Sequence, residues 1–466
     1  MEEAGLITAT ANWKTEAAKL TKSAPIILFE ITGYSRSFAT KDPGFGTFDA
    51  WIAAISNHRQ SADELGGVST LGDLQVTVGD VAQAITGDFP FVFEGRTATI
   101  KVGFVGLAQA DYALFATVVV DRVASVNKNT AWQFICKPKA RNLRSVVYAA
   151  GDDGQPTGKD HPKTLQAHPL DTLTDIWQNE LGLPLGELDT TTINAYRDEV
   201  FTSIEFAFTL VKPPDAKTFI EKQLLAPLGG FLYNQADGTL SVRFLMPLPG
   251  GITSQHTLNP ANMATLPQPG QVALVNVVTH RMDWDGDDFL VSNVQIDAAS
   301  ETKYGQQGGH VIESLGMRTA LGGVGLARVV AIAIFNRFGD KQLRLPQVTS
   351  MWNDAALLEV GDYLKVTHPL TPNRATGALG ITDELFVVRA VSREWLRGRV
   401  KLALDDAGLV EAGAGVDPAG LGPFKIAPNT VLEYAAAPAV DQDKYMFVSD
   451  DATGQYSNSD EGHPLA

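Results

Sequence analysis

The chain has 466 residues, a formal net charge of -16 and 44% hydrophobic residues. This composition is typical of a globular protein of two to four domains, and it excludes disorder, collagen-like repeats and coiled coil. The acidic balance argues against a protein that coats nucleic acid, because phosphate binding requires a surplus of Lys and Arg. An acidic surface is compatible with a passage through which DNA slides without binding.

The N-terminal leader, residues 1–24, lacks the basic and apolar regions of a signal peptide. The longest purely apolar run, 329–335, is too short to span a bilayer. We therefore expect the protein to be made and folded in a cytoplasm. Cys136 is the single cysteine of the sequence, which excludes an intrachain disulfide and a zinc site built from several thiolates.

Residues 25–138 are predicted to form an antiparallel β-barrel. Apolar and polar residues alternate at 74–78, 100–104 and 132–136, and a period of two is typical of a strand with one buried face. Turn-forming residues separate these segments, which favours strands that pair with their neighbours in sequence. We expect a mainly β fold with two such barrels and an inserted α+β domain.

The inserted domain is predicted at 139–246 and should contain two helices. The first begins near Pro169 and ends at Gly182, because apolar residues recur at helical spacing between them. The second follows Asp215, whose carboxylate is a suitable N-cap, and ends before Pro227. The spacing of apolar residues thus changes from a period of two to a period of 3.6, which indicates a new domain.

Two strands are predicted to complete the inserted domain. Residues 203–210 alternate between apolar and polar types, and so do residues 240–246, which follow the turn at 236–238. The strand at 240–246 is expected to return to the first barrel and to pair there.

The second barrel is predicted at 247–406, after a segment rich in Pro and Gly. A hairpin is expected from 272–282 and 289–296, on either side of an Asp-Gly turn. A helix at about 324–338 is apolar on most sides, which predicts burial. Residues 407–466 are expected to form a linker and a C-terminal extension.

Cys136 is the first candidate for chemistry, because a thiolate can act as a nucleophile. A reactive cysteine lies in an electropositive and partly exposed place, with a histidine base in reach. The alternation instead places Cys136 on the same strand face as Trp132 and Phe134. We interpret it as a small buried hydrophobic residue.

The histidines are the second candidate. The eight histidines include no HExxH motif and no i,i+4 pair, which disfavours a metalloprotease. His161 and His168 could converge in a loop, but each is followed by proline, and two histidines without a third ligand make a weak metal site. No pair of carboxylates can be assigned to glycosidase geometry from the sequence alone.

Two further motifs resemble binding loops incompletely. The segment 283–288 has carboxylates at alternate positions, as a calcium loop does, but glycine is at the fourth position and Val294 replaces the bidentate glutamate. We interpret it as an acidic hairpin tip. The segment 322–328 is glycine-rich and opens a helix, yet Arg328 occupies the third glycine position of a dinucleotide turn. We expect Arg328 to pair with a neighbouring subunit or to cap a turn.

Several segments of the sequence occur in an order that is found in one family. They are residues 114–119, 132–136, 141–143, 168–173, 214–220, 228–233, 312–316, 358–368 and 444–450. In this order they resemble the baseplate hub proteins of phages with long non-contractile tails. That family shares its fold with the central hub of contractile tails and with the core of the type VI spike protein VgrG.

The resemblance implies a non-enzymatic structural protein of the virion, located at the tail tip and assembled in the host cytoplasm. It implies a homotrimeric ring in which two barrels per chain present six similar faces, which matches a six-fold tail tube to a three-fold tip. The implied partners are a distal tail protein, a tape measure protein and a tail fibre or spike. DNA would pass through without stable binding, and contact with the host envelope would be indirect. No catalytic, cofactor-binding or metal-binding residue is implied.

Two other functions remain open at the level of the sequence. A tail-associated cell-wall hydrolase or peptidase would need a catalytic constellation, and zymography on cell walls would detect its activity. A receptor-binding tail protein would be β-rich as well, but such proteins often carry repeats, and the sequence contains no internal repeat.

Overall fold

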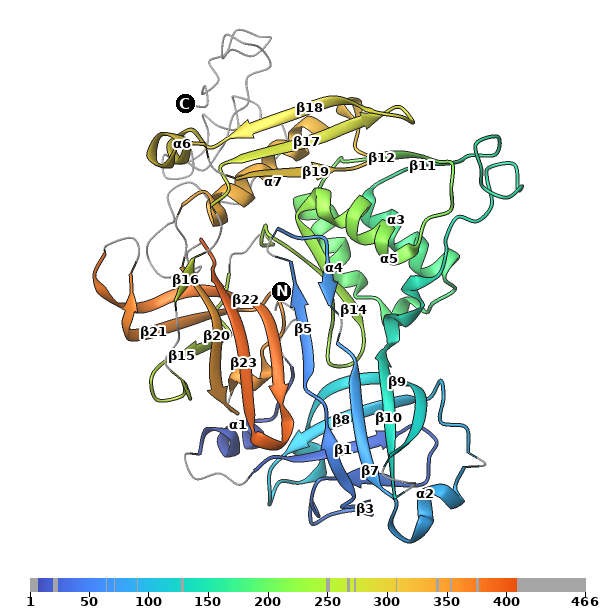
Figure 1. Ribbon diagram of the computed structural model, residues 1–466, viewed down its shortest axis with the longest axis vertical. Coiled ribbons are helices and arrows are strands. Elements are labelled where there is room, and N and C mark those ends of the chain that lie inside the picture. Colours follow the sequence, from blue (N-terminus) through green and yellow to red (C-terminus); the bar gives the residue numbers. More distant parts are fainter. Residues whose placement is uncertain are drawn as a thin grey trace.

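A computed structural model describes residues 7–408, except for 20–23, 64, 71, 90, 127–129, 249–251, 266–268, 272–273, 307, 341–342, 353 and 374–376. The predicted extension beyond residue 408 therefore lies outside the described residues. Figure 1 shows one eight-stranded sheet at the lower end of the molecule and a second beside and above it. The inserted helices lie to the right, and a three-stranded sheet lies at the upper end.

The first sheet is built from the N-terminal third of the chain. Its order is β3 (Phe48–Asp49), β2 (Ser37–Ala39), β1 (Ile26–Ile31), β8 (Thr97–Gly103), β9 (Ala113–Val126), β10 (Ala131–Pro138), β7 (Leu74–Gly79) and β4 (Ile52–Ile55). The predicted alternation is present, since Leu74, Val76 and Val78 of β7 are fully buried and the residues between them are not. The short helix α2 (Ala84–Gly87) follows β7.

Part of the predicted leader is a helix, α1 (Ala11–Ala18), whose N-cap is Thr10. The Trp13 side chain is fully buried in the core of the first sheet, and its indole Nε1 donates a hydrogen bond to the Val102 carbonyl at 2.9 Å. The Ile7 amide donates to the Leu357 carbonyl at 3.1 Å. The described leader therefore joins the first sheet to the second half of the chain.

The first sheet is open, which corrects the prediction of a closed barrel. Its end strands β3 and β4 do not pair with each other in the described part of the chain. The next strand, β5 (His58–Ala62), pairs antiparallel with β22 of the second sheet, with Ser61 opposite Ala390. The chain thus uses β5 to connect two sheets instead of closing one.

The inserted region contains three helices that begin as α-helices and continue as π-helical turns. They are α3 (Pro169–Asp175) with Ile176–Glu180, α4 (Thr190–Ala195) with Tyr196–Val200, and α5 (Ala216–Phe219) with Ile220–Leu225. The Asp215 carboxylate accepts from the Thr218 amide at 2.9 Å, so the predicted N-cap is confirmed. The first helix ends as predicted at Gly182, which has a left-handed φ of 62°. The helix α4 was not predicted.

Two hairpins accompany these helices. The strand β11 (Lys163–Ala167) pairs with β12 (Phe206–Leu210), and β13 (Gly230–Asn234) pairs with β14 (Leu240–Phe244). The prediction that the last of these strands pairs with the first sheet is wrong, because β14 forms a two-stranded sheet with β13. The turn between them closes locally, since the Thr239 amide donates to the Asp237 carboxylate at 2.8 Å.

The second large sheet has a branched arrangement. Its main order is β15 (His256–Leu258), β21 (Tyr363–Pro372), β22 (Leu379–Glu394), β23 (Arg399–Asp406), β20 (Leu343–Met351) and β16 (Gly270–Gln271), with β5 on β22 and β6 (Ser69–Thr70) on β5. Most pairs are antiparallel, but β15 and β21 are parallel. This sheet is also open among the described residues, so the second predicted barrel is not closed either.

The predicted hairpin and buried helix form a layer at the upper end of the molecule. The hairpin is β17 (Val277–Trp284) and β18 (Phe289–Ile296), and β19 (Gly309–Glu313) pairs parallel with β17 on its other side. The short helix α6 (Ala298–Tyr304) follows β18. The helix α7 (Gly323–Phe338) packs on this sheet and buries Leu326, Val330 and Ile334, so both predictions are confirmed.

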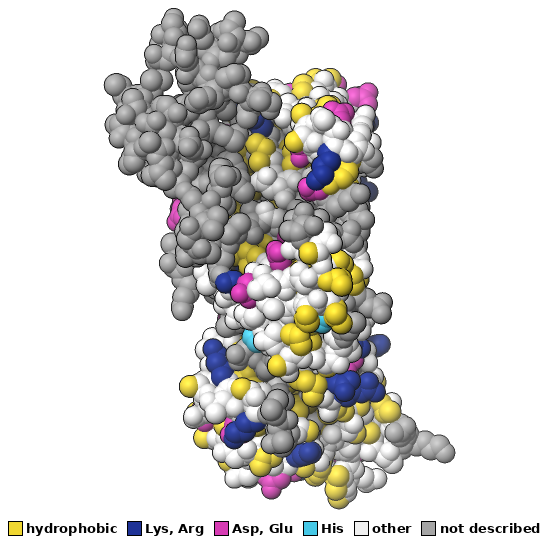
Figure 2. Space-filling model, turned by 90° about the vertical axis from the view of Figure 1, so that its left-hand side faces the viewer, with side chains coloured by type: hydrophobic (Ala, Val, Ile, Leu, Met, Phe, Trp, Pro, Cys, Tyr) yellow, Lys and Arg dark blue, Asp and Glu magenta, His cyan; other side chains and the backbone are white. Residues whose placement is uncertain are grey.

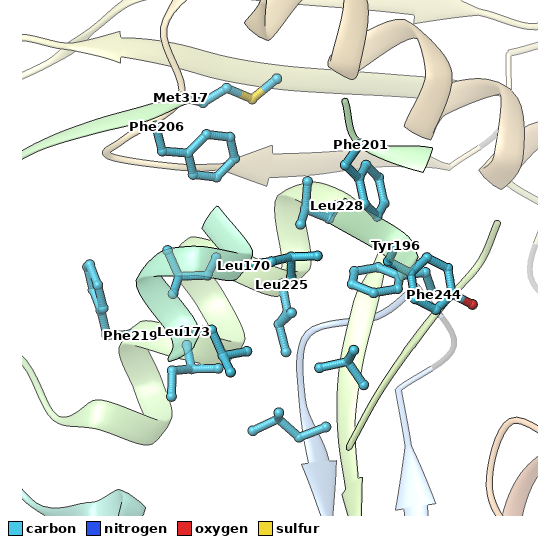
Figure 3. Close-up of a cluster of buried hydrophobic side chains, with 14 of the residues drawn as sticks. Leu170, Leu173, Tyr196, Phe201, Phe206, Phe219, Leu225, Leu228, Phe244 and Met317 are labelled. Atoms are coloured by element: carbon cyan, nitrogen blue, oxygen red, sulfur yellow. The ribbon is translucent and has the colours of Figure 1, made fainter. Parts of the chain in front are cut away.

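The apolar core is divided into three main clusters. One joins the inserted helices to α7 and the three-stranded sheet, and Figure 3 shows side chains such as Phe206, Leu225 and Met317 converging in it. Each eight-stranded sheet has a cluster of its own. Within the described residues, the helices are too short or too polar to cross a membrane.

Candidate functional site

Cys136 lies in the middle of the first sheet, between Leu74 of β7 and Val120 of β9. Its side chain is 0% exposed. Burial, with a smaller effect from Asp121, raises the pKa of its thiol to about 12. The thiol therefore stays protonated at neutral pH, and the predicted buried position is confirmed.

We expect Cys136→Ala to leave the protein folded, with a loss of about 1 kcal/mol or less, because the change removes one buried sulfur atom. Thermal unfolding of the purified variant measures this loss. If the variant lost a hydrolytic activity that the parent protein shows, the structural interpretation of Cys136 would be wrong.

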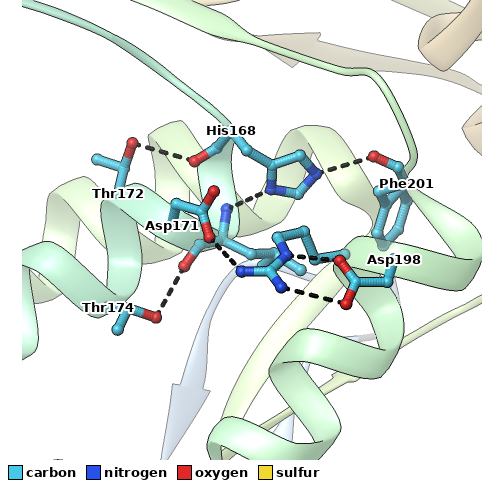
Figure 4. Close-up of polar contacts among 8 residues, drawn as sticks. His168, Asp171, Thr172, Thr174, Asp198 and Phe201 are labelled. Atoms are coloured by element: carbon cyan, nitrogen blue, oxygen red, sulfur yellow. Dashed lines mark hydrogen bonds and ion pairs between the residues drawn. The ribbon is translucent and has the colours of Figure 1, made fainter.

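His168 has a structural role at the start of α3. Its Nδ1 accepts a hydrogen bond from the Leu170 amide at 3.1 Å, and its Nε2 lies 2.8 Å from the Phe201 carbonyl, to which it donates (Figure 4). Burial lowers the pKa of His168, so the neutral ring with a proton on Nε2 fits both contacts. Both ring nitrogens are used, and neither is free for a metal.

An ion-pair network lies beside His168. The Arg197 guanidinium contacts Asp171 at 2.8 Å and Asp198 at 2.7 Å, and thereby connects α3 to the segment that follows α4 (Figure 4). His161 instead pairs with Asp153 at 2.6 Å in an exposed loop. Among the described residues, no group of three or more His, Cys, Asp or Glu side chains could hold a metal ion.

The acidic segment 283–288 is a hairpin tip between β17 and β18. The Asp283 carboxylate accepts from the Thr319 amide at 3.0 Å and from the Thr319 hydroxyl at 2.7 Å. Asp285 accepts from the amides of Asp287 and Asp288, both at 2.9 Å. The segment is therefore an acidic hairpin tip, as expected from the sequence, and the Asp285 carboxylate accepts from backbone amides of the turn itself.

The glycine-rich segment before α7 is a tight turn. Gly322 has a φ of 85°, and a Cβ on Gly323 would lie 2.5 Å from the Arg318 carbonyl oxygen. Both glycines are therefore required by the backbone path. Burial lowers the pKa of Arg328, and its Nη2 atom is buried without a hydrogen-bond partner in the described structure. Its pairing with a neighbouring subunit stays a prediction.

Aromatic side chains join the two eight-stranded sheets. Trp352 and Trp395 come from the second half of the chain, yet both belong to the core of the first sheet. The Trp352 ring stacks on Phe115 of β9 with ring centroids 5.1 Å apart. The Trp395 indole donates to the Ser56 carbonyl at 2.9 Å. The two sheets therefore share one core at this junction, which sequence periodicity could not reveal.

Buried charges reinforce the same junction. The Arg393 side chain is 1% exposed and donates to the carbonyls of Ala356 at 3.0 Å and Leu358 at 2.7 Å. Burial lowers its pKa to about 10. Burial, with Asp362 nearby, raises the pKa of Glu359.

The inserted hairpin is connected to this network by Arg243 of β14. Its guanidinium lies 3.4 Å from Asp362, and it also lies over the Tyr233 ring. The Asp362 carboxylate accepts from the Glu359 amide at 2.8 Å. Three parts of the chain therefore meet at a buried polar centre.

A small cavity lies where β5, β9 and the β13–β14 turn meet. Its lining includes His58, Gln60, Thr117 and Pro138. The Nδ1 atom of His58 and the Oε1 atom of Gln60 are buried and have no hydrogen-bond partner among the described residues. Burial, with a smaller effect from Arg393, lowers the pKa of His58 to about 3.

This pKa predicts how stability depends on pH. The folded protein favours neutral His58, whereas the unfolded chain binds a proton at the ordinary pKa of 6.5. The contribution of His58 to the free energy of unfolding is therefore fully present above pH 6.5 and is lost as pH falls toward 3. In His58→Gln the free energy of unfolding should therefore fall less steeply between pH 6.5 and 3. Denaturant unfolding at several pH values measures the slope, and equal slopes in parent and variant would contradict the prediction.

Charges on the surface are mixed on the face drawn in Figure 2. Basic side chains (dark blue) and acidic ones (magenta) are scattered there among hydrophobic side chains (yellow). The acidic surplus of the chain is therefore not gathered into one patch on this face.

Comparisons with known proteins give matches among solved structures alone. No family model and no curated protein matches the chain. A tail protein from Neisseria meningitidis aligns with 83% of this chain and 98% of its own length, at 10% identity and a TM-score of 0.44. The 43 kDa tail protein of prophage MuSo2 from Shewanella oneidensis aligns with 84% of this chain and 99% of its own length, at 13% identity and a TM-score of 0.42.

A third match is a prophage tail protein from Listeria monocytogenes. It aligns with 82% of this chain and 94% of its own length, at 10% identity and a TM-score of 0.45. All three are tail proteins. Because their TM-scores are below 0.5, the function is proposed from the residues of this chain.

Proposed function

We propose that this chain is a non-enzymatic structural protein of a phage tail, the hub of the tail tip. The main support for the proposal is the junction at which two eight-stranded sheets share one aromatic core. Each chain then presents two large β units in a fixed relation, because β5, Trp352 and Trp395 connect them. Three such chains would present six β units.

The proposed ring is a homotrimer that joins a six-fold tail tube to a three-fold tip. The proposed partners are a distal tail protein, a tape measure protein and a tail fibre or spike. The proposed domains are 25–138, 139–246 and 247–406, with a C-terminal extension at 407–466. The order of sequence motifs along nearly the whole chain supports this assignment.

DNA would pass through the proposed ring without binding to it. At -16 per chain, a trimer carries three times that charge, or -48, and such a surface repels phosphates. Repulsion between the subunits would then have to be offset by apolar contacts at their interfaces. Tight, salt-sensitive binding of the purified protein to duplex DNA would contradict this part of the proposal.

Light scattering tests the trimer directly. The purified protein, alone or with neighbouring tail proteins, should have a mass of three times 49.9 kDa. A strictly monomeric or dimeric species under both conditions would overturn the hub assignment. Zymography on cell walls provides the second test, since a band of lysis would favour a hydrolase.

A further inference from the structure

Among the described residues, the strand β18 is an edge strand without the usual protection. It lies at one side of the sheet order β18–β17–β19, and Figure 1 shows it as the outer strand at the upper end of the molecule. Its sequence, Phe-Leu-Val-Ser-Asn-Val-Gln-Ile, contains no charge, no proline and no glycine. Natural edge strands usually carry such residues, because a bare edge invites pairing with another strand.

The outer face of this sheet carries exposed apolar side chains as well, chiefly on β18. Leu290, Val294 and Ile296 of β18 are 67%, 51% and 50% exposed, and Val311 of β19 is 47% exposed. The inner side offers half-buried apolar side chains, namely Val291 of β18 and residues of α7. A strand added beside β18 would therefore gain apolar contacts on both faces if its own side chains were apolar.

The described chain ends close to this edge. Gly408 packs against the last turn of α7, where a Cβ on it would lie 2.3 Å from the Asn336 carbonyl oxygen. One turn further, a Cβ on Gly339 would lie 2.6 Å from the carboxylate of Asp297, the residue that directly follows β18. The remaining 58 residues, 409–466, therefore begin near the C-terminal end of β18.

One segment of those 58 residues has the required pattern. Residues 445–448 are Tyr-Met-Phe-Val, and no other stretch of 409–466 has four consecutive large apolar residues. Successive side chains of a strand point to opposite faces, so these four would supply apolar groups to both. We propose that residues 444–449 add to β18 of the same chain as a fourth strand and place apolar side chains beside the exposed ones of β18.

The connection is long enough for this pairing. Residues 409–443 provide 35 residues between Gly408 and Lys444. A chain of that length and glycine-rich composition has a root-mean-square span of about 30 Å. An eight-residue strand is about 27 Å long, so the segment can reach any part of β18. This proposal is independent of the trimer, because it involves one chain.

Hydrogen exchange of the full-length protein tests the proposal. The β18 amides that point away from β17 should exchange slowly in the parent protein and about ten-fold faster in Phe447→Asp, because a charge cannot enter the apolar contact. The matched control is Phe424→Asp, which lies in the same C-terminal region and should leave β18 exchange unchanged. Equal exchange in parent and Phe447→Asp would overturn the proposal.

A disulfide distinguishes the chain's own segment from other occupants. In a Cys136→Ala background, Ser292→Cys and Met446→Cys should join under mild oxidation within one chain, which denaturing electrophoresis shows as a species of monomer mass. A disulfide that forms between chains would mean that a second copy covers β18. That result, or protection of β18 that depends on an added tail protein, would overturn the assignment to residues 444–449.

Discussion

Trp395→Ala is expected to lower the free energy of unfolding by about 3–5 kcal/mol, which is the range for removal of a large buried aromatic side chain. The Trp395 side chain is 1% exposed. Its ring lies 5.9 Å from that of Trp352 and 6.1 Å from that of Phe115, between centroids. Its loss would also leave the Ser56 carbonyl without this indole donor.

The same change should reduce the coupling between the two eight-stranded sheets. Thermal unfolding of the parent is expected to involve both sheets together, since they share a core, whereas Trp395→Ala should separate their transitions. The control is Trp284→Ala at the half-exposed hairpin tip, where we expect about 1 kcal/mol. Equal losses in the two variants would show that Trp395 has no special role at the junction.

Arg393→Met is expected to cost about 3–5 kcal/mol, because it removes one partner from a buried charged network. The carbonyls of Ala356 and Leu358 would lose their guanidinium donor. Arg393 also lowers the pKa of the buried Glu359, so its removal should raise that pKa further. Glu359 would then be protonated over a wider pH range.

The matched control is Arg397→Met, four residues along the chain, where the arginine is exposed. We expect a change within about 0.5 kcal/mol there, as for most surface substitutions. Denaturant unfolding at neutral pH measures both variants. A loss below 1 kcal/mol for Arg393→Met would mean that the network contributes little beyond the packing of its carbon atoms.

The elements that depend on nearby residues could be predicted from the amino-acid sequence. The Asp215 cap, the end of a helix at Gly182 and the hairpin of β17 and β18 were predictable, because caps, left-handed glycines and strand alternation involve neighbours in the chain. The burial of Cys136 followed from the same alternation. The interpretation of Cys136 as a small buried side chain was therefore available without a structure.

Which elements pack against each other became clear only from the three-dimensional structure. The connection of two sheets by β5, the pairing of β14 with β13, and the position of Trp395 in the core of the first sheet depend on contacts between residues that are distant in sequence. Periodicity shows which face of a strand is buried but does not show against which partner. The junction of Arg393, Glu359 and Asp362 could not be predicted for the same reason, since buried charges become favourable only when tertiary packing brings their partners within reach.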